Sequence, residues 1–346
     1  MNTTPKQLGF HCPSEFEKHD ATWLSWPHNK DTWPGKISTI FPSYCNFVEL
    51  LSHSEKVNIN VGDEKLKLKA MDFLSKTNTN WDNIEFHFNP TNDAWCRDHG
   101  PAFIVNRKER KKAIVNWGYN SWGGKYPPFD LDNEVPKRIG KALNLQVFNP
   151  EIIMEGGSIE LNGDGSLLTT TACLMNKNRN PHLSQKQIEN YLIEYYGVEQ
   201  VLWLNEGIVG DDTDGHIDDL SRFASENTVI TAIEDSNKDE NYYPLKDNLK
   251  RLVSMKLVNG KSLEIIELPM PSPLYFLNRR LPASYANFYI CNSYVIVPTF
   301  RDKNDDKALM VLQKAFPNHK VVGIDSYDII WGLGSFHCLS QQEPSI

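Results

Sequence analysis

Short apolar runs typical of β-strands alternate with longer stretches of helical periodicity along almost the whole chain. The expected strands cover residues 56–61, 113–117, 152–161, 166–171, 229–233, 263–267, 294–297 and 321–324. The expected helices cover residues 38–53, 184–196, 245–257 and 305–316. In several places strands follow one another before the next helix. This mixed order predicts an α/β fold.

The helix that starts near residue 184 has the clearest ends. Ser184 and Gln187 have the spacing of a capping box, which satisfies free backbone N–H groups in the first turn. Gly197 can adopt the left-handed conformation that commonly ends a helix. We therefore expect this helix to have a structural role.

The sequence contains no Pro/Ser-rich or charged linker and no evident internal repeat. Its most polar window, residues 234–241, is followed by the same alternation of strands and helices. We interpret this window as a surface loop. The expectation is a single domain that spans residues 1–346.

Charge and hydropathy exclude several classes of partner. The chain has 36 basic and 44 acidic residues, a formal net charge of −8, and its main basic run, residues 107–112, is interrupted by Glu109. We interpret that run as a solvated hairpin turn and expect no nucleic-acid partner. The sequence has neither a signal-peptide pattern nor a stretch of about 20 apolar residues. We expect no membrane partner and a cytoplasmic location.

One of the six cysteines stands out. The six are scattered, and no C-x-x-C pair suggests a zinc site or a redox dithiol. Cys338 follows Gly332 and Gly334 in a loop rich in backbone donors, where a thiol can be activated. His337 occupies the last glycine position of a G-x-G-x-x-G pattern, so no dinucleotide site is expected. On an extended segment His337 would also point away from Cys338, and we expect the base to come from elsewhere.

Two acidic residues stand next to turn-forming residues. Asp98 follows Arg97 and precedes a Gly-Pro turn, so it either forms a surface ion pair or offers a carboxylate to a cation. Trp95 is either a core residue or an apolar wall of that site. Glu155 lies in an apolar run before two glycines. A buried carboxylate there needs a partner, a raised pKa or a ligand.

The densest acidic segment is residues 210–219. It is not an EF-hand loop, because Ile217 and Phe223 occupy the positions that require Gly and Glu. His216 and Asp218 are two residues apart, and an extended segment would place both side chains on one face. We favour a base and carboxylate pair over a metal site, and we expect neither a metal nor an organic cofactor.

A thiol, an imidazole and several carboxylates together favour a cationic electrophile. Carboxylates oppose the negative charge that develops in a cysteine protease, whereas they pair well with the N–H donors of a guanidinium. In this hypothesis Asp98 and Asp218 hold the guanidinium while Cys338 attacks its carbon. His216, assisted by Glu155, protonates the departing ammonia and then activates water. The carboxylates should also raise the thiol pKa in the empty site, so that the bound cation favours the thiolate.

The same residues lie in segments that resemble the agmatine deiminases of the guanidine-modifying superfamily, which are related to bacterial-type peptidylarginine deiminase. The matching segments are WCRDHGP (95–101), NWGYNSWGG (116–124), EGGS (155–158), NRNP (178–181), DTDGHID (212–218), SYANFY (284–289) and HCLSQQ (337–342). They extend over nearly the whole chain.

The resemblance implies a five-bladed, pseudo-symmetric α/β propeller of the pentein type with a central site. It also implies hydrolysis of agmatine to N-carbamoylputrescine and ammonia, as in polyamine biosynthesis, through a covalent thiouronium intermediate. The implied catalytic residues are the nucleophile Cys338, the acid/base His216, the guanidinium-binding Asp98 and Asp218, and the further carboxylate Glu155. The implied substrate-binding residues are Trp95 as an apolar wall, Asp212 for the distal amine, and Trp122.

The sequence departs from the family pattern at His99, where a small hydroxyl residue is usual, and at Leu333, which interrupts a run of glycines near the nucleophile. Two alternatives stay open. A peptidylarginine or free-arginine deiminase would need a cation for the α-carboxylate, which Arg179 could supply, and a non-catalytic binder of guanidines or polyamines would keep only the fold. The expected partner is a small cationic guanidine substrate, agmatine, and a homo-oligomer is compatible with the sequence.

Overall fold

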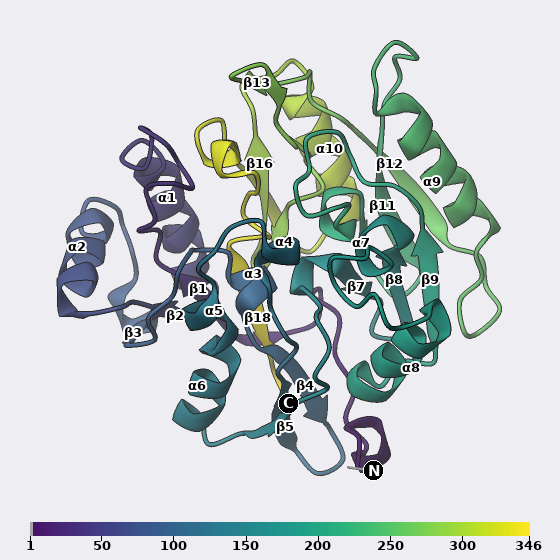
Figure 1. Cartoon of the computed structure of the whole chain (residues 1–346). Coiled ribbons are helices and arrows are strands. Elements are labelled where there is room, and N and C mark those ends of the chain that lie inside the picture. The colour runs from purple at the N-terminus through teal and green to yellow at the C-terminus, as the bar shows by residue number, and fades with distance from the viewer. Residues whose placement is uncertain (1–2) are drawn as a thin grey trace.

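Five sheets of three or four strands and one two-stranded hairpin form the β-structure of the computed structural model, which describes residues 3–346 (Figure 1). The five larger sheets share one internal order. A first strand pairs antiparallel with a middle strand, and the middle strand pairs parallel with the strand that follows it after a helix. Parallel neighbours require such a crossover, whereas antiparallel neighbours can be joined by a turn. We call each such set a sheet unit.

The sheet units follow one another along the chain. Unit 1 comprises β18 (Ser340–Pro344), β1 (His19–Ser25), α1 (Phe41–Ser52), β2 (Lys56–Asn60), α2 (Glu64–Leu74) and β3 (Ile84–His87). Unit 2 comprises β4 (Ala102–Asn106), β5 (Lys111–Val115), α6 (Val135–Ala142) and β6 (Gln146–Phe148). Unit 3 comprises β7 (Ile159–Leu161), β8 (Ser166–Thr170), α8 (Gln185–Tyr196) and β9 (Gln200–Leu204).

The remaining two units have the same composition. Unit 4 comprises β10 (Ser221–Phe223), β11 (Thr228–Ile233), α9 (Tyr242–Ser254) and β12 (Glu264–Pro269). Unit 5 comprises β15 (Tyr289–Ile290), β16 (Tyr294–Thr299), α10 (Asp305–Ala315) and β17 (Lys320–Asp325). The hairpin of β13 (Tyr275–Phe276) and β14 (Arg279–Arg280) lies between units 4 and 5, and the short helices are α3 (Cys96–His99), α4 (Ser121–Gly124), α5 (Asp130–Asn133) and α7 (Thr171–Leu174).

The apolar faces of the crossover helices pack on the sheets. In unit 5, for example, Ala308 and Leu312 of α10 are fully buried in one cluster with Val295 and Val297 of β16. Similar clusters lie under α1, α6, α8 and α9. Figure 1 shows these helices toward the outside of the molecule, while the short α3, α4 and α7 lie near its middle. The packing explains why helical periodicity recurs at intervals in the sequence.

The C-terminal strand completes the first unit. β18 pairs antiparallel with β1, with Gln341 opposite Trp23, so the last strand of the chain lies beside the first. This pairing fixes the loop that precedes β18, which carries Cys338, against the N-terminal part of the chain.

The expected helices are all present within a few residues of the predicted bounds, and the capping box at Ser184 is confirmed. The hairpin is confirmed as well, since β4 and β5 pair on either side of residues 107–110. The polar window 234–241 lies between β11 and α9, as predicted for a loop. No helix among residues 3–346 is both long enough and apolar enough to cross a bilayer.

The expected strand over residues 152–161 is wrong in its first part. Only Ile159–Leu161 forms a strand, and Gly156–Ser158 form a 3-10 turn. A Cβ on Gly156 would lie 2.1 Å from the backbone oxygen of Arg97, so the glycine allows an approach between two backbones that ladder pairing would not. The five-bladed closed arrangement stays a prediction, because no sheet within residues 3–346 closes on itself.

Candidate active site

The connections between successive sheet units meet at one site. They cover residues 88–101, 149–158, 205–220, 270–288 and 326–339. Each contributes at least one polar side chain: Asp98, Glu155, His216 with Asp218, Asn287 and Cys338, all of them buried. Functional groups on connections held by a rigid scaffold are common in enzymes.

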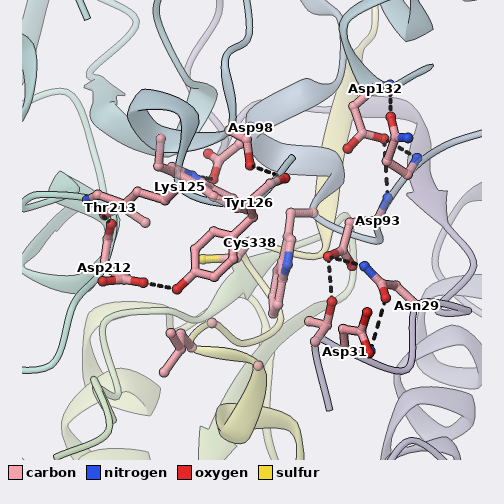
Figure 2. Close-up of a pocket in the computed structure, with 18 of the residues that line it drawn as sticks. Asn29, Asp31, Asp93, Asp98, Lys125, Tyr126, Asp132, Asp212, Thr213 and Cys338 are labelled. Carbon is pink, nitrogen blue, oxygen red and sulfur yellow. Dashed lines mark hydrogen bonds between the residues drawn. The ribbon is translucent and has the colours of Figure 1, made fainter. Parts of the chain in front are cut away.

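A cavity of about 620 Å³ opens over this site. Of the residues expected from the sequence, Trp95, Asp98, Trp122, Asp212 and Cys338 line it. In Figure 2, Asp212 and Tyr126 lie on one side of Asp98 and Cys338, and Asp93 and Asp132 lie on the other.

Gly157 marks where the remaining groups converge behind the cavity. A Cβ on this glycine would lie 2.6 Å from His216 Nδ1, 2.9 Å from Asp98 Oδ1 and 3.0 Å from Asp218 Oδ2. His216 and Asp218 thus lie close together, although Ile217–Asp219 form a 3-10 turn and not the extended segment expected. The structure therefore brings the predicted imidazole and carboxylates together.

Cys338 is held by the side chain of Asn287. The amide nitrogen of Asn287 lies 3.0 Å from Cys338 Sγ, and its oxygen accepts hydrogen bonds from the backbone N–H groups of Ser335 and Cys338. The loop turns at Leu333, which has a left-handed φ of 72°, and a Cβ on Gly334 would lie 2.7 Å from the ring of Trp95. Sequence reasoning missed Asn287, although it lies in the matching segment SYANFY.

The surroundings of Cys338 favour the protonated thiol. Burial raises its pKa well above the ordinary range, and the nearby carboxylates of Asp218, Asp219 and Asp98 raise it further, against a smaller effect of the Asn287 hydrogen bond. The predicted effect of the carboxylates is confirmed. A bound cation would offset these negative charges and favour the thiolate.

His216 is a neutral base. Burial lowers its pKa to about 3, which the charge of Asp218 only partly opposes. Neither ring nitrogen has a hydrogen-bond partner within residues 3–346, and Nδ1 lies 3.7 Å from Asp98 Oδ1. The backbone is fixed by its N–H, which donates to Asp211 and Thr213. The imidazole is therefore positioned by the loop and free to exchange a proton.

Asp98 and Asp218 have opposite pKa shifts. Asp98 accepts hydrogen bonds from Trp122 Nε1 at 2.9 Å and from the Gly157 N–H at 2.9 Å. Its pKa is nevertheless raised well above normal, by burial and by the charges of Asp218 and Glu155. For Asp218, burial favours a higher pKa, but the hydrogen bond and charge of His337 and the charge of Arg222 lower it.

His337 contacts two acids. Its Nδ1 lies 2.6 Å from Asp218 Oδ2, and its Nε2 lies 2.8 Å from Glu15 Oε2. The premise that Cys338 lies on an extended segment was wrong, since residues 336–339 form a turn. Both nitrogens of His337 are occupied, whereas neither ring nitrogen of His216 has a hydrogen-bond partner within residues 3–346.

Glu15 was missed by sequence reasoning because nothing around it in the chain suggests a site. Its carboxylate also lies 2.9 Å from Arg97 and 2.8 Å from Arg222 and accepts the N–H of Ile290. Burial would raise its pKa, but Arg222, His337 and Arg97 hold that pKa well below normal. Glu15 thus joins segments that are far apart in the sequence.

Arg179 is not available to a substrate. Its side chain is fully buried, with Nε 2.7 Å from Glu155 Oε1, and it also pairs with Asp214 and donates to the backbone oxygen of Thr213. The hypothesis that Arg179 receives the α-carboxylate of arginine is therefore wrong. Its contact with one oxygen of Glu155 leaves Oε2 without a hydrogen-bond partner in the described part of the chain.

Asp212 lies at the mouth of the cavity, where Arg279 is 2.8 Å away and the Tyr126 hydroxyl donates to it. Trp95 packs against Trp33, with ring centroids 5.4 Å apart. His99, where the sequence departs from the family pattern, does not line the cavity, and its Nε2 lies 2.9 Å from Ser25 Oγ.

One set of side chains among residues 3–346 has the ligand types and spacing of a possible metal site. The three residues are Glu155, Cys173 and His216.

Comparison with known proteins identifies the family. The model of the Porphyromonas-type peptidyl-arginine deiminase family matches residues 11–344. The chain belongs to this family. It is 36% identical to the agmatine deiminase of Medicago truncatula, with 100% of this chain and 99% of that protein covered.

Solved structures of this family agree. The agmatine deiminase of Enterococcus faecalis has a TM-score of 0.92 and 32% identity, and the match covers 100% of this chain and 98% of that one. A cysteine-to-serine variant of the C. jejuni agmatine deiminase, solved with substrate bound, has a TM-score of 0.87 and 36% identity over 96% of each chain. An amidinotransferase from Microseira wollei, with 11% identity and a TM-score of 0.54, shares the fold. The α/β fold is thus that of the agmatine deiminase structures.

Replacing Glu15 tests its contribution to the folded state. Glu15→Gln should lower the free energy of unfolding at pH 7 by about 3–5 kcal/mol, because it removes a charge that pairs with two buried arginines and leaves only Arg222 with another acid, Glu160. The pKa of Glu15 is depressed in the folded protein, so its stabilisation is present above about pH 4.3 and is lost as pH falls through the folded value. The difference between the two proteins in urea unfolding should therefore narrow below about pH 4.3.

Glu17→Gln is the matched control. Glu17 pairs with the half-exposed Arg107, so its loss should cost no more than about 1 kcal/mol. Equal destabilisation by the two substitutions would contradict the assignment of Glu15.

Proposed function

We propose that the protein hydrolyses agmatine to N-carbamoylputrescine and ammonia, with Cys338 as the nucleophile. One observation carries the proposal. Glu155 Oε2, both nitrogens of His216 and Asp218 Oδ1 are buried and have no hydrogen-bond partner within residues 3–346. Buried polar groups left unpaired are costly, and a planar guanidinium with its several N–H donors would satisfy the carboxylates.

The reaction begins with binding of the cation. Asp98 and Asp218 hold the guanidinium, whose positive charge lowers the thiol pKa that the carboxylates had raised. His216, neutral in the empty site, accepts the thiol proton. The thiolate attacks the guanidinium carbon and forms a C–S bond.

Collapse of the tetrahedral adduct completes the first half of the reaction. The C–N bond to the terminal nitrogen breaks, and His216 returns its proton to that nitrogen as ammonia leaves. A thiouronium remains on Cys338. His216 then removes a proton from water, and the hydroxide adds to the same carbon. The C–S bond breaks as the hydroxyl group of the adduct loses its proton to solvent, which releases the neutral urea product, and His216 returns its proton to the Cys338 thiolate. Glu155, next to His216, stabilises the imidazolium in both halves.

The charges at the cavity favour agmatine over arginine. Asp212 at the mouth offers a carboxylate to the distal amine of agmatine, whereas the α-carboxylate of arginine would be repelled by it. Arg179 is enclosed by Glu155 and Asp214, so it does not offer its charge to an α-carboxylate, whereas Arg279, 2.8 Å from Asp212, offsets part of the charge of that acid. The named agmatine deiminases among the relatives point to the same substrate.

The sheet units support a further part of the proposal. We take them to be the five blades of a single domain over residues 1–346, arranged about the cavity. The support is that each connection between units supplies a polar residue to one site. A small metabolic amine as substrate fits the cytoplasmic location expected from the sequence.

A comparison of substrates tests the specificity. We expect kcat/KM for agmatine to exceed that for arginine or a peptidyl-arginine by about 100-fold, the equivalent of about 2.7 kcal/mol. Ammonia release measured for the three substrates at pH 7.5 gives the ratio. In Asp212→Asn the ratio should fall, because the variant loses attraction for the amine and repulsion of the carboxylate. A wild-type preference for either arginine substrate would overturn the assignment.

Replacing Cys338 tests the nucleophile. Cys338→Ser should lower kcat by about 1,000-fold or more, because a serine hydroxyl is a much weaker nucleophile than a thiolate. Acid-quenched wild-type enzyme should carry an amidine adduct on Cys338 in its intact mass. Cys12→Ser, a half-buried cysteine outside the site, is the control and should retain activity. Unchanged turnover in Cys338→Ser would exclude the mechanism, and an adduct in the wild type would exclude a non-catalytic binder.

Replacing Gly157 tests whether activity depends on the close approach of His216, Asp98 and Asp218 around this glycine. Gly157→Ala should lower kcat/KM by about 100-fold, since its Cβ would displace His216, Asp98 or Asp218. Gly62→Ala is the control, because its Cβ would meet Pro90 at an ordinary 3.9 Å. Both variants are assayed with agmatine, and their folding is checked by circular dichroism. Full activity of a folded Gly157→Ala protein would show that the three groups do not act together.

A further inference from the structure

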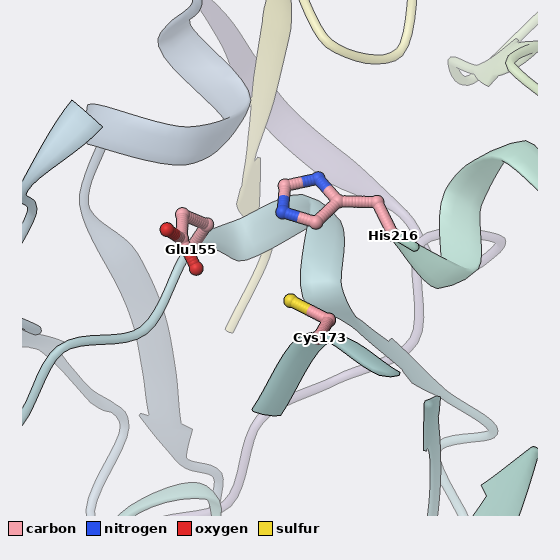
Figure 3. Close-up of side chains that lie close together, drawn as sticks. All are labelled: Glu155, Cys173 and His216. Atoms are coloured by element: carbon pink, nitrogen blue, oxygen red, sulfur yellow. The ribbon is translucent and has the colours of Figure 1, made fainter. Parts of the chain in front are cut away.

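Cys173 lies against the deep side of the site, although the proposed reaction does not use it. Its sulfur, one ring nitrogen of His216 and one carboxylate oxygen of Glu155 all lie within 4.8 Å of one another. In Figure 3 the sulfur points toward the space between the other two side chains. The three residues come from different connections and elements, with Cys173 on α7.

Two of these side chains have unpaired atoms that could bind a metal ion. Both nitrogens of His216 and Oε2 of Glu155 have no hydrogen-bond partner among residues 3–346. Both side chains are fully buried. Arg179 binds the other oxygen of Glu155, which fixes the carboxylate while leaving Oε2 free. The unpaired atoms therefore face a thiol that has no assigned role.

The three side chains offer the types of ligand that suit a zinc ion. A thiolate, an imidazole and a carboxylate are the ligands that Zn²⁺ takes in proteins, in tetrahedral sites that a water can complete. With metal–ligand distances of about 2.0–2.3 Å, tetrahedral ligand atoms lie about 3.3–3.8 Å apart. The three ligand atoms lie within 4.8 Å of one another, so they would have to approach one another by about 1 Å to bind the ion. Rotation of the side chains can supply this movement. The thiolate and carboxylate together balance the charge of the ion.

We propose that Glu155, Cys173 and His216 bind Zn²⁺, and that the bound ion inhibits the enzyme. On binding, Cys173 loses its proton to solvent and its sulfur bonds to the metal. While it is bound to the ion, His216 cannot transfer a proton and Glu155 cannot stabilise the imidazolium. The positive charge of the ion also repels the guanidinium of the substrate. Binding itself is independent of the proposed function, whereas inhibition rests on it.

Cobalt binding without substrate tests the site directly. In Cys338→Ser, which removes the other thiol of the site, Co²⁺ should bind at one ion per chain with the near-ultraviolet charge-transfer band of a cobalt–thiolate bond. Adding Cys173→Ser should abolish the band and weaken Zn²⁺ binding by at least about tenfold in competition with a chromophoric chelator. Adding Cys291→Ser, at a buried cysteine elsewhere, should change neither.

Serine is used because it keeps the approximate size of cysteine, and circular dichroism identifies any variant that fails to fold. Cys173→Ala, in the same background, provides a second measurement. A thiolate band that persists in either folded Cys173 variant would overturn the proposal. Loss of the band in Cys338→Ser alone would also overturn it, since the ion would then use the nucleophile.

Inhibition is measured separately, with each variant compared with its own metal-free rate. Zn²⁺ should raise the apparent KM for agmatine in the wild type, and Cys173→Ser should require at least about tenfold more Zn²⁺ for the same effect. Equal sensitivity of the two proteins would refute inhibition through Cys173. If agmatine is not turned over at all, the proposed function fails, while the cobalt spectrum still decides the metal site.

Discussion

The carboxylate of Glu15 connects the parts of the chain on which the site depends. It contacts Arg97, which precedes Asp98, and His337, which precedes Cys338. Its other oxygen contacts Arg222 and the backbone of Ile290. This buried acid is strongly held because it shares its charge with the buried guanidinium groups of Arg97 and Arg222, the second of which also pairs with Glu160. The positions of the nucleophile loop and of α3 therefore both depend on one electrostatic arrangement near the N-terminus.

The buried carboxylates of this arrangement differ in how many charged partners they have, and their pKa values differ accordingly. Glu15 is fully engaged with cations, and its pKa is depressed. Asp218 takes one hydrogen bond from His337, which keeps it ionised, and leaves its second oxygen free. Asp98 is bound only by neutral N–H donors, and its pKa is raised. Two acids in one site with opposite shifts are typical of active sites, because their environments move the pKa values in opposite directions.

Sequence reasoning located the elements and the reactive groups better than it located their supports. Helical periodicity and capping are local, so the helix from Ser184 was predicted closely. The chemistry of Cys338, His216 and the acids is also visible in local composition. Glu15 and Asn287 were missed because each acts on residues far away, as Glu15 does on His337 across 322 positions. The repeat of sheet units left no sequence signal, since its first strands are as short as two or three residues and the loops between units differ.

The same unpaired atoms favour two kinds of cation, and geometry separates the two. A guanidinium is broad and planar, so its donors could reach both Asp98, which lines the cavity with Cys338, and Asp218, whose Oδ2 lies 3.6 Å from Cys338 Sγ. A metal ion is small and needs donors on several sides, which His216 finds only toward Glu155 and Cys173. Because His216 stands between the two groups, it cannot serve both at once. A neutral imidazole, kept so by burial, has a nitrogen lone pair that can accept either a proton or a metal ion. The feature that prepares the site for catalysis therefore also exposes it to metals.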